Sequence, residues 1–485
     1  MMDFKELLFG VSLESVSGST SVPIASVTTD SRTVSTNTLF IAIRGLRHDG
    51  HEHIDDAVKK GAIAIICEYF PEKQTDLVTY VQVPSSRRAY SIVSSNFHDR
   101  PSEKLKLVGV TGTNGKTSIV QLLFDTFQHL GHSVGKLSTI GNAINQQNYP
   151  ATHTTPDPME TNAFLAKMLG AGVSHCFMEV SSHGIDQCRI DGLQFAGGIF
   201  TNLTHDHLDY HNTFENYRDT KKRFFDSLPA SAFSISNKDD RNGEFMLQNC
   251  DAKKHFYGLK NTADFKAKIL EHDFSGMQLR INDKEIWTSL IGDFNASNML
   301  AVYACTDLLN VDSEQALSTL SAIEPVLGRF NVVSTQNIIA IIDYAHTPDA
   351  LDHVLKTINK IRTGNELLIT VVGCGGERDK AKRPVMGKIA SILSDKVIFT
   401  SDNPRNEDPD QIIEEIESGV PAEYFKKYLS ISNRAQAIKT ACQLAHSGDI
   451  ILVAGKGHET YQEIKGERTD FDDVKELKKQ LQTKN

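Results

Sequence analysis

The sequence lacks the features of a secreted, disulfide-stabilised or membrane-spanning protein. Its seven cysteines are an odd, scattered set without a Cys-x-x-Cys pair, so we expect reduced thiols and neither a disulfide framework nor a cysteine zinc site. The segment Met1 to Glu6 carries no basic stretch followed by an apolar core, and no apolar run approaches membrane-spanning length. These absences predict a cytoplasmic protein without membrane insertion.

An excess of positive charge is also missing. The net charge of -10 argues against a general nucleic-acid binder, whereas an anionic small substrate needs only local basic groups. Hydrophobic residues make up 40% and charged residues 23% of the 485 residues, as in ordinary globular proteins. At roughly 150 residues a domain, the length indicates about three domains.

A glycine-rich turn lies between a strand-like and a helix-like stretch at residues 108–118. The apolar run 105–110 predicts a buried strand, and 119–124 has helical spacing. Free backbone N–H groups and the helix dipole at such a turn attract phosphate. Val110 stands where the generic P-loop has its first glycine, but the remaining pattern fits. Gly112 and Gly115 allow the backbone to come close to the phosphates, Lys116 can reach the terminal phosphates, and the Thr117 hydroxyl can bind magnesium. We therefore expect a nucleoside triphosphate and Mg²⁺.

Strands alternate with helical segments along the whole chain, which predicts an α/β protein with a parallel, doubly wound sheet in each segment. A polar stretch at 96–102 precedes the phosphate strand and marks a first boundary, and a new strand–helix series starts near Val332. The expected strands are 38–43, 62–67, 105–110, 176–180, 197–201, 232–236, 338–343, 367–372, 396–401 and 449–454. The turns 28–32 and 45–50 are ligand loops or, more simply, ordinary connections.

Three further clusters of polar residues leave more than one interpretation open. Glu179, at the end of an apolar run, is where a second magnesium ligand belongs, or a paired structural acid. The loop 201–211 packs three histidines into a short span, which fits a zinc hydrolase, a magnesium site with one imidazole, or a polar hydrogen-bonded loop; for His205 and His211 the last is preferred. By spacing alone, Lys221-Lys222-Arg223 predicts a solvated basic helix face.

The last third carries loops after three strands, at 373–380, 402–405 and 455–459. Loops at the carboxyl ends of parallel strands converge on one crevice. Arg378 and Arg405 are suited to binding carboxylates, and Glu459 to pairing an ammonium group. The crevice therefore fits an amino acid; surface ion pairs are the alternative.

Five motifs, in this order along the chain, resemble the Mur ligases of peptidoglycan synthesis: 111–117, 179–184, 201–211, 343–348 and 402–405. The resemblance covers essentially the whole chain and is greatest to the enzymes that add the third residue of the stem peptide to UDP-N-acetylmuramoyl-L-alanyl-D-glutamate. It implies a UDP-muramoyl-substrate domain (1–100), a central P-loop ATPase domain (101–328) and a Rossmann-like amino-acid domain (329–485). It also implies that ATP phosphorylates the D-glutamate γ-carboxylate and that an incoming amine attacks the acyl phosphate. A monomeric enzyme of cell-wall biogenesis, acting on small molecules, is expected.

The resemblance also implies roles for individual residues. Catalysis is assigned to Lys116, His207 and Lys221, and metal binding to Thr117, Glu179, His207 and Lys221, the last as a carbamate. The ATP site is assigned to Gly112, Thr113, Asn114, Gly115, Lys116, Thr117, Ser118, Asn295, Asn298, Arg329 and Asp343. The UDP-muramoyl-dipeptide site is assigned to Ser31, Leu46, Arg47, His48, Thr154, Thr155, Ser181, Gln187 and Arg189. The amino-acid site is assigned to Arg378, Asp402, Asn403, Pro404, Arg405, Gly455 and Glu459.

The identity of the third residue depends on Arg405. Within the family, arginine at this position resembles the meso-diaminopimelate type, and diaminopimelate has a distal carboxylate for it to bind. L-lysine has none, and an unpaired arginine would disfavour it by several kcal/mol. Three alternatives stay open: the same reaction with lysine, a folylpolyglutamate-synthetase-like ligase, and a P-loop regulatory ATPase without ligase activity.

Overall fold

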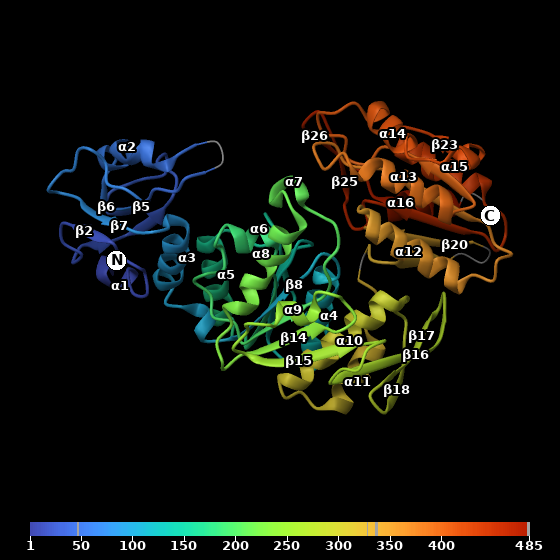
Figure 1. The fold of residues 1–485 in the computed structure, drawn as a ribbon, viewed down its shortest axis with the longest axis horizontal. Helices are drawn as coiled ribbons and strands as arrows, with labels where there is room; N and C mark the ends of the chain where they lie inside the picture. The colour runs from blue at the N-terminus through green and yellow to red at the C-terminus, as the bar shows by residue number, and fades with distance from the viewer. Residues whose placement is uncertain (46–47, 327, 335–337, 483–485) are drawn as a thin grey trace.

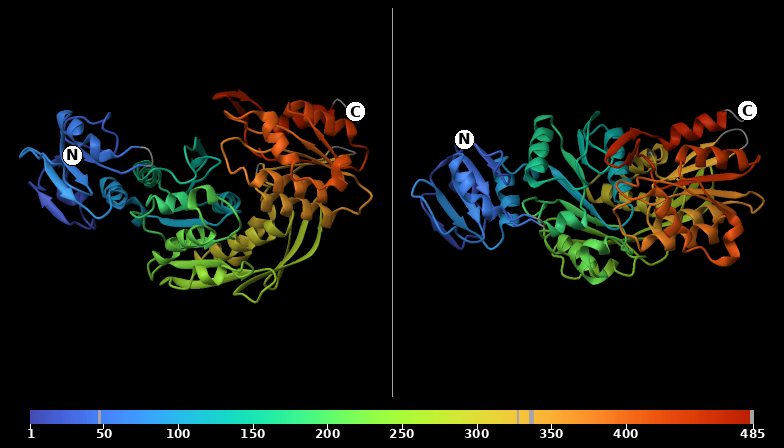
Figure 2. Two further views of the ribbon diagram at one scale, coloured as in Figure 1. Left: turned by 45° about the horizontal axis from the view of Figure 1, so that its top comes forward. Right: turned by 90° about the horizontal axis from the view of Figure 1, so that it is seen from above.

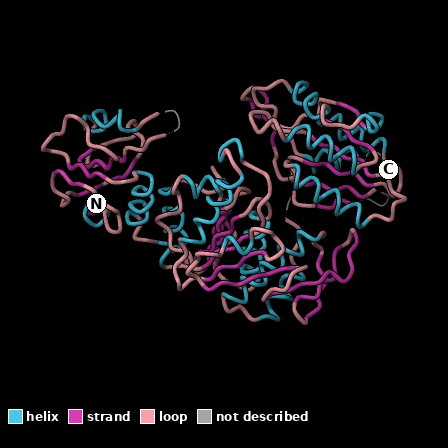
Figure 3. The backbone as a smooth tube through the Cα atoms, in the orientation of Figure 1, coloured by secondary structure: helices cyan, strands magenta, loops and turns pink. Residues whose placement is uncertain are grey.

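The computed structural model describes residues 1–45, 48–326, 328–334 and 338–482. They build three α/β units, each around its own sheet, which follow one another along the molecule (Figure 1). Apolar clusters pack on both faces of each sheet, so each unit has helix, sheet and helix layers. The views in Figures 2 and 3 show the N-terminal unit joined to the central unit beside helix α3.

The N-terminal unit has the strand order β2-β7-β6-β5-β4, parallel except for the pair β2–β7. The predicted strands at 38–43 and 62–67 are confirmed as β5 and β6. The elements are β1 (Met2–Asp3), α1 (Phe4–Leu7), β2 (Ser15–Ser17), β3 (Pro23–Ile24), β4 (Ser26–Thr28), β5 (Thr38–Ile41), η1 (Gly50–His53), α2 (Ile54–Lys59), β6 (Ala62–Cys67), β7 (Thr79–Gln82), α3 (Ser86–Phe97) and η2 (Pro101–Glu103).

The central sheet has the order β11-β10-β9-β12-β8-β13-β14-β15-β16-β17-β18. Its helices are α4 (Lys116–His129), α5 (Pro158–Gly170), α6 (Ser182–Asp186), α7 (Leu208–His211), α8 (Phe214–Asp226), α9 (Gly243–Met246), α10 (Asp293–Leu308) and α11 (Ser313–Ala322). Its strands are β8 (Lys106–Thr111), β9 (Val134–Leu137), β10 (Asn142–Ile144), β11 (Gln147–Tyr149), β12 (His175–Glu179), β13 (Gly197–Phe200), β14 (Phe233–Asn237), β15 (Lys253–Gly258), β16 (Phe265–Asp273), β17 (Gly276–Ile281) and β18 (Lys284–Thr288).

The expectation of a purely parallel sheet is wrong at the edges of the central sheet. The middle of the sheet, β9-β12-β8-β13-β14-β15-β16, consists of parallel pairs. At its edges, the pairs β9–β10, β10–β11, β16–β17 and β17–β18 are antiparallel. The reason is the connections: a short turn such as Asn282-Asp283 between β17 and β18 can join only antiparallel strands. β8 lies between β12 and β13, so the loops after these three strands meet at one point.

The C-terminal sheet has the order β19-β20-β24-β21-β22-β23, parallel except for β19–β20. All four predicted strands of this segment are present. The elements are β19 (Asn331–Ser334), β20 (Ile339–Asp343), α12 (Pro348–Ile361), β21 (Leu368–Val372), α13 (Lys382–Leu393), β22 (Lys396–Phe399), α14 (Pro409–Glu417), η3 (Ala422–Lys427), β23 (Tyr428–Ser430), α15 (Arg434–Leu444), β24 (Ile450–Ala454), β25 (Tyr461–Ile464), β26 (Glu467–Asp470) and α16 (Asp473–Gln482).

Candidate active site

The predicted phosphate loop connects β8 to α4. Leu107, Val108 and Val110 of β8 are fully buried, and α4 begins at Lys116 directly after the loop. Gly115 caps the helix with φ 89°, and a Cβ at this position would lie 2.8 Å from the Asn298 side-chain oxygen. Glycine is therefore required there both by the backbone angle and by the approach of α10. The strand–turn–helix geometry is that of an anion-binding site.

The half-buried Lys116 and the buried Lys221 meet at one carbonyl of this loop. The Nζ atoms of Lys116 and Lys221 donate to the Gly112 carbonyl oxygen at 2.9 and 2.8 Å, and Lys116 also donates to Thr113 O at 2.8 Å. Burial lowers the pKa of Lys116 and, together with the charge of Lys116, lowers the pKa of Lys221 well below its ordinary value. The solvated basic face expected at 221–223 is wrong for Lys221 and Lys222, which are 1% and 6% exposed. They face inward because α8 packs Tyr217, Phe224 and Phe225 beside them.

Glu179 ends β12 next to the phosphate loop and is 1% exposed. Its carboxylate accepts hydrogen bonds from Thr117 Oγ1 at 3.0 Å, Ser138 Oγ at 2.6 Å, and Thr139 N and Oγ1 at 2.8 and 3.2 Å. The structure thus brings the two predicted metal ligands Thr117 and Glu179 into contact. Ser138 and Thr139 were missed because no motif links them to a residue about forty positions away.

His207 has φ 54° and belongs to an aromatic cluster beside the phosphate loop. Its ring centroid lies 5.0 Å from that of His183 and 6.1 Å from that of Tyr217, whose hydroxyl is 3.1 Å from Thr113 Oγ1. Burial lowers the pKa of His207 to about 4, although Asp206 acts in the opposite direction. The imidazole is therefore neutral at pH 7, the form that can bind a cation.

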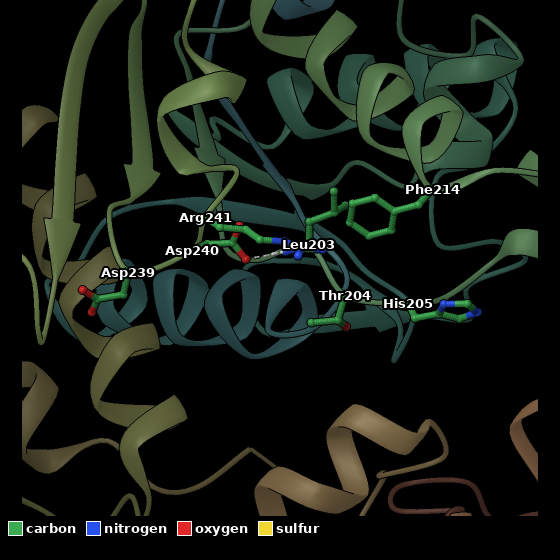
Figure 4. A pocket seen from close by; sticks show the side chains of 7 residues that line it. All are labelled: Leu203, Thr204, His205, Phe214, Asp239, Asp240 and Arg241. Atoms are coloured by element: carbon green, nitrogen blue, oxygen red, sulfur yellow. Dashed lines mark hydrogen bonds between the residues drawn. The ribbon is translucent and has the colours of Figure 1, made fainter. Parts of the chain in front are cut away.

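The loop that precedes His207 lines a cavity of about 760 Å³ together with residues that follow β14 (Figure 4). Asp240 Oδ2 accepts the Leu203 N–H at 2.8 Å, the dashed line in Figure 4. Asn202 in turn accepts from the phosphate loop, with Oδ1 bound by Asn114 N at 2.9 Å and its carbonyl by Thr113 N at 2.8 Å. Asn202 and Asp240, which sequence reasoning missed, connect β13 and β14 to the phosphate loop. His205 is exposed and lines this cavity.

The four predicted ATP-site residues outside the phosphate loop fall into two groups. Asn295 and Asn298 are buried on α10, where Asn295 Nδ2 donates to Ile291 O at 2.9 Å. Arg329 and Asp343 lie in the C-terminal unit, with the Arg329 guanidinium 4.5 Å from the Tyr344 ring centroid. Burial raises the pKa of Asp343 to about 6, although Arg329 lowers it.

A hydrogen bond crosses between the central and C-terminal units at the phosphate loop. Asn114 Nδ2 donates to Asp349 Oδ2 at 2.9 Å. Asp349 lies in the first turn of α12, which follows the loop after Asp343. The phosphate loop is therefore joined directly to the segment of the C-terminal unit that follows Asp343.

A cavity of about 860 Å³ lies between the N-terminal and central units. Four of the predicted UDP-muramoyl-site residues line it, namely Ser31, His48, Gln187 and Arg189, together with His153. The sequence reasoning missed three further lining residues: Arg87, Tyr90 and Asp157. Leu46 and Arg47 lie outside the described residues. The cavity is lined by several basic side chains, which suits an anionic ligand.

Thr154, Thr155 and Ser181 connect this cavity to Glu179. Thr155 Oγ1 donates to the Glu179 carbonyl at 2.8 Å and accepts the Ser181 N–H at 2.9 Å. Arg189 donates to the Thr155 carbonyl at 2.6 Å, and Thr139 Oγ1 lies 3.0 Å from Thr154 Oγ1, within hydrogen-bond distance. These residues form one continuous network from the cavity to the acidic group beside the phosphate loop.

The amino-acid-site candidates lie together at the carboxyl ends of β21, β22 and β24. Asn403 Nδ2 donates to Glu459 Oε2 at 2.8 Å, and Arg405 NH1 donates to Gly376 O at 2.6 Å. A Cβ at Gly455 would lie 2.6 Å from Asp402 Oδ2, so a larger residue cannot replace it without movement. Arg378 is exposed on the facing loop, and Pro404 is buried.

Lys456 is a member of this cluster that sequence reasoning missed. Its side chain is fully buried and donates to Asn403 Oδ1 at 3.1 Å and Glu459 Oε2 at 3.3 Å. Burial raises the pKa of Glu459, and the Lys456 ammonium lowers it. Glu459, which we expect to pair an ammonium group of the substrate, thus already pairs in part with the ammonium group of Lys456. The position of Lys456, between Gly455 and Gly457, was the available signal.

Within the described ranges, no three His, Cys, Asp or Glu side chains form a ready-made metal site. The Thr117 hydroxyl and a Glu179 carboxylate oxygen lie within hydrogen-bond distance of each other. Mg²⁺ is commonly bound by one or two such protein ligands plus substrate phosphates. The donor set therefore fits Mg²⁺. None of the described helices is long and apolar enough to cross a membrane.

Comparison with known proteins identifies similar chains over the full length. Three family models match in succession: "Mur ligase family, catalytic domain" at 23–109, "Mur ligase middle domain" at 110–306 and "Mur ligase, glutamate ligase domain" at 328–457. The UDP-N-acetylmuramoyl-L-alanyl-D-glutamate–2,6-diaminopimelate ligase of Cytophaga hutchinsonii is 53% identical over 484 residues, 99% of each chain. That of Bacteroides thetaiotaomicron is 51% identical over 478 residues, 98% of this chain and 99% of the other. A solved structure of such a ligase superposes with a TM-score of 0.72 at 30% identity, covering 100% of this chain and 99% of the other.

Proposed function

This chain belongs to the Mur ligase family, and we propose that it ligates meso-2,6-diaminopimelate to UDP-N-acetylmuramoyl-L-alanyl-D-glutamate in an ATP-dependent reaction. The observation that carries this proposal is the 53% identity, over 99% of both chains, to a relative named for that activity. The arrangement of the candidate site agrees with the chemistry that the name implies.

Each of the three units is assigned one substrate. Residues 1–100 bind the UDP-muramoyl part, 101–328 form the P-loop ATPase, and 329–485 bind the amino acid. In support, the large cavity involves the first two units, the phosphate loop lies in the second, and the loops with Arg378, Arg405 and Glu459 all lie in the third.

The first step is transfer of the ATP γ-phosphoryl group to an oxygen of the D-glutamate γ-carboxylate, which yields ADP and an acyl phosphate. This activation is needed because an amine cannot displace an oxygen from a free carboxylate at a useful rate. Lys116, now bound to the Gly112 carbonyl, is placed to neutralise charge on the phosphates, and the N–H groups at the start of α4 orient them.

Mg²⁺ would be held by Thr117 and Glu179, and by His207 from the neighbouring loop. When bound, it would offset the repulsion between the carboxylate and the triphosphate. Lys221 as a carbamate would add to this set one negative charge shared by two oxygens. The support for this modification is its burial beside Lys116, away from bulk water, where a carbamate would gain a cationic partner.

The second step is attack of an amino group of diaminopimelate on the acyl carbon, with loss of inorganic phosphate and a proton. Arg405 and Arg378 bind the distal carboxylate, and Glu459, with Asn403 beside it, pairs the ammonium group. Lys456 holds Glu459 in place by a hydrogen bond and lowers its pKa, against the effect of burial. The runner-up activity, ligation of L-lysine, would leave Arg405 without a carboxylate partner.

The decisive test is phosphate release by the purified protein with ATP, Mg²⁺ and the UDP-muramoyl-dipeptide. Release is expected with diaminopimelate and not with lysine; release with lysine alone would refute the proposed specificity. Turnover on folate and glutamate would indicate a folylpolyglutamate-synthetase-like ligase, and ATP hydrolysis that needs neither dipeptide nor amino acid would indicate a regulatory ATPase. A thermal-shift panel of the same ligands gives an independent readout, since ligands that bind the folded state raise its stability.

The remaining expectations concern location and assembly. No disulfide joins any of the seven cysteines, which supports a reducing, cytoplasmic environment. A monomer is proposed because each substrate finds its candidate residues within one chain. Size-exclusion chromatography with light scattering tests this.

A further inference from the structure

Arg383 is a fully buried arginine beneath the two loops of the amino-acid site. It lies in the first turn of α13, and its side chain has no exposed surface. We call residues 373–380 the first loop, which carries Arg378, and residues 402–407 the second loop, which carries Arg405.

The Arg383 guanidinium binds both loops at once. Its NH1 and NH2 groups donate to Glu407 Oε2 and Oε1 at 2.9 and 3.0 Å, a two-pronged pair with the second loop. NH2 also donates to the Gly375 carbonyl of the first loop at 3.3 Å. A third bond, from NH1 to Glu415 Oε2 at 2.7 Å, reaches helix α14 and involves neither loop.

Glu407, the main partner of Arg383, also binds the first loop. Its carboxylate accepts the Glu377 N–H and pairs with Lys380 Nζ at 3.3 Å. The hydrogen bond to Arg383 is the largest cause that holds the pKa of Glu407 near 2, so this carboxylate stays ionised throughout the neutral range. Glu407 and Arg383 together therefore connect the loops through a charged centre.

The loops are also joined where the proposed ligand groups lie. Arg405 NH1 donates to Gly376 O at 2.6 Å, and Gly376 N donates to Asn403 O at 2.9 Å. A Cβ at Gly376 would lie 1.9 Å from the Pro404 carbonyl. Because the loops pack this closely, a shift of one displaces Arg405.

A purely stabilising role explains Arg383 poorly. Buried ion pairs contribute little net stability, since desolvation of the charges offsets their attraction. Arg383 also leaves its Nε–H without a hydrogen-bond partner among the described residues. The presence of a buried guanidinium with one unsatisfied donor is better explained by the geometry that it imposes on the two loops.

We propose that Arg383, through its two-pronged bond to Glu407, is a positioning residue that sets the separation of Arg378 and Arg405 for the substrate carboxylate. The proposal rests on the proposed function, because it assigns these two arginines to diaminopimelate. It makes recognition of the amino acid dependent on a residue that does not touch it.

The test compares Arg383→Lys and Glu407→Gln with the matched control Glu415→Gln. Glu415 binds the same guanidinium from α14 and reaches the first loop through a long, 3.9 Å pair with the exposed Lys380 side chain. For Arg383→Lys and Glu407→Gln, the KM for diaminopimelate is expected to rise about 10- to 100-fold. The KM values for ATP and the UDP-muramoyl-dipeptide, and the Tm relative to Glu415→Gln, should stay nearly unchanged. Arg383→Met should exceed Arg383→Lys in effect. An unchanged KM for diaminopimelate in folded variants would overturn the proposal, as would a parallel rise in all three KM values with a lower Tm.

Amide hydrogen exchange separates this proposal from the proposed function, because it needs no substrate. In Arg383→Lys, the Glu377 and Gly376 amides should exchange faster than in the wild type, while amides of β21 keep their protection. If the wild type does not use diaminopimelate, the proposed function fails and exchange still decides whether Arg383 orders the loops. Unchanged exchange at Glu377 and Gly376 would refute that ordering.

Discussion

Removal of the Arg405 side chain is the sharpest test of the third-residue specificity. Arg405 lies on a turn with φ 53°, and its backbone pairs with β25 through Arg405 N to Glu463 O at 3.0 Å and Lys465 N to Arg405 O at 2.6 Å. These backbone bonds do not depend on the side chain. Arg405→Ala should therefore remove the guanidinium and keep the loop in place.

The size of the effect follows from the number of free donors. A guanidinium has five N–H groups, and one NH1 hydrogen of Arg405 is bound to Gly376 O, so enough remain for a two-pronged bond to a carboxylate. Losing one partner of a buried, hydrogen-bonded charge pair costs about 2–5 kcal/mol. This corresponds to a decrease of about 30- to 5000-fold in kcat/KM for diaminopimelate. Use of lysine should not decrease, because lysine presents no carboxylate there.

The assay is phosphate release at saturating ATP and UDP-muramoyl-dipeptide, with diaminopimelate or lysine varied. Arg468→Ala is the matched control, since Arg468 is an exposed arginine on the adjacent strand β26 that pairs with Glu463 at 3.1 Å. Such a surface pair contributes about 0–1 kcal/mol, so its kcat/KM should change little. If Arg405→Ala and Arg468→Ala behaved alike, the assignment of Arg405 to the substrate carboxylate would be wrong.

Three further predictions concern the metal, the buried lysine and the acid of the C-terminal unit. Glu179→Gln should raise the Mg²⁺ concentration needed for half-maximal activity about tenfold or more, and an unchanged Mg²⁺ titration would exclude Glu179 as a ligand. Lys221→Arg cannot form a carbamate and should lower kcat about 100-fold or more. The control Lys222→Arg, at the neighbouring lysine of α8 that pairs with Asp226, should not lower kcat. Equal effects of the two substitutions, or a native mass of the wild type without added carbon dioxide, would rule out the carbamate. The pKa of Asp343 is about 6 in the folded protein against 3.8 unfolded, so the folded state binds this proton more tightly. The contribution of Asp343 to the free energy of unfolding is complete below pH 3.8, and about 3 kcal/mol of it is lost as the pH rises to 6. Asp343→Asn should not show this loss when denaturant titrations at pH 4 and pH 7 are compared. The same pH dependence in the variant and the wild type would contradict the prediction.

The elements that could be predicted from the sequence are those with a continuous apolar run followed by a polar loop. Strands β8, β12, β20 and β24 fit this description because they are covered on both faces. The strands β16 to β18 were missed, since their buried and exposed residues alternate and they include charged positions such as Lys266 and Lys268. Such a pattern is typical of an antiparallel edge and differs little from a polar loop when it is judged by apolar runs.

The candidate site divides in the same way. Recognisable motifs contain Lys116, Thr117, Glu179 and Arg405. The structure brings the first three together at the phosphate loop and places Arg405 against the loop that carries Arg378. Ser138, Asn202 and Arg383 could not be identified, because their importance lies in hydrogen bonds to residues distant along the chain. The wrong expectation for Lys221 and Lys222 has the same origin, since spacing alone cannot show which helix face packs against β8.

The contact between Asn114 and Asp349 indicates that the two halves of the reaction are not confined to separate units. Asn114 belongs to the phosphate loop, and its side chain is bound by a carboxylate of the C-terminal unit at 2.9 Å. The same short segment of that unit begins with Asp343, whose carboxylate accepts the Phe330 and Ala345 amides at 2.7 Å each. Lys360, at the other end of α12, pairs with Asp293 of the central unit at 3.0 Å. Because α12 contacts the central unit at both ends, the position of the amino-acid loops relative to the phosphate loop depends on this helix.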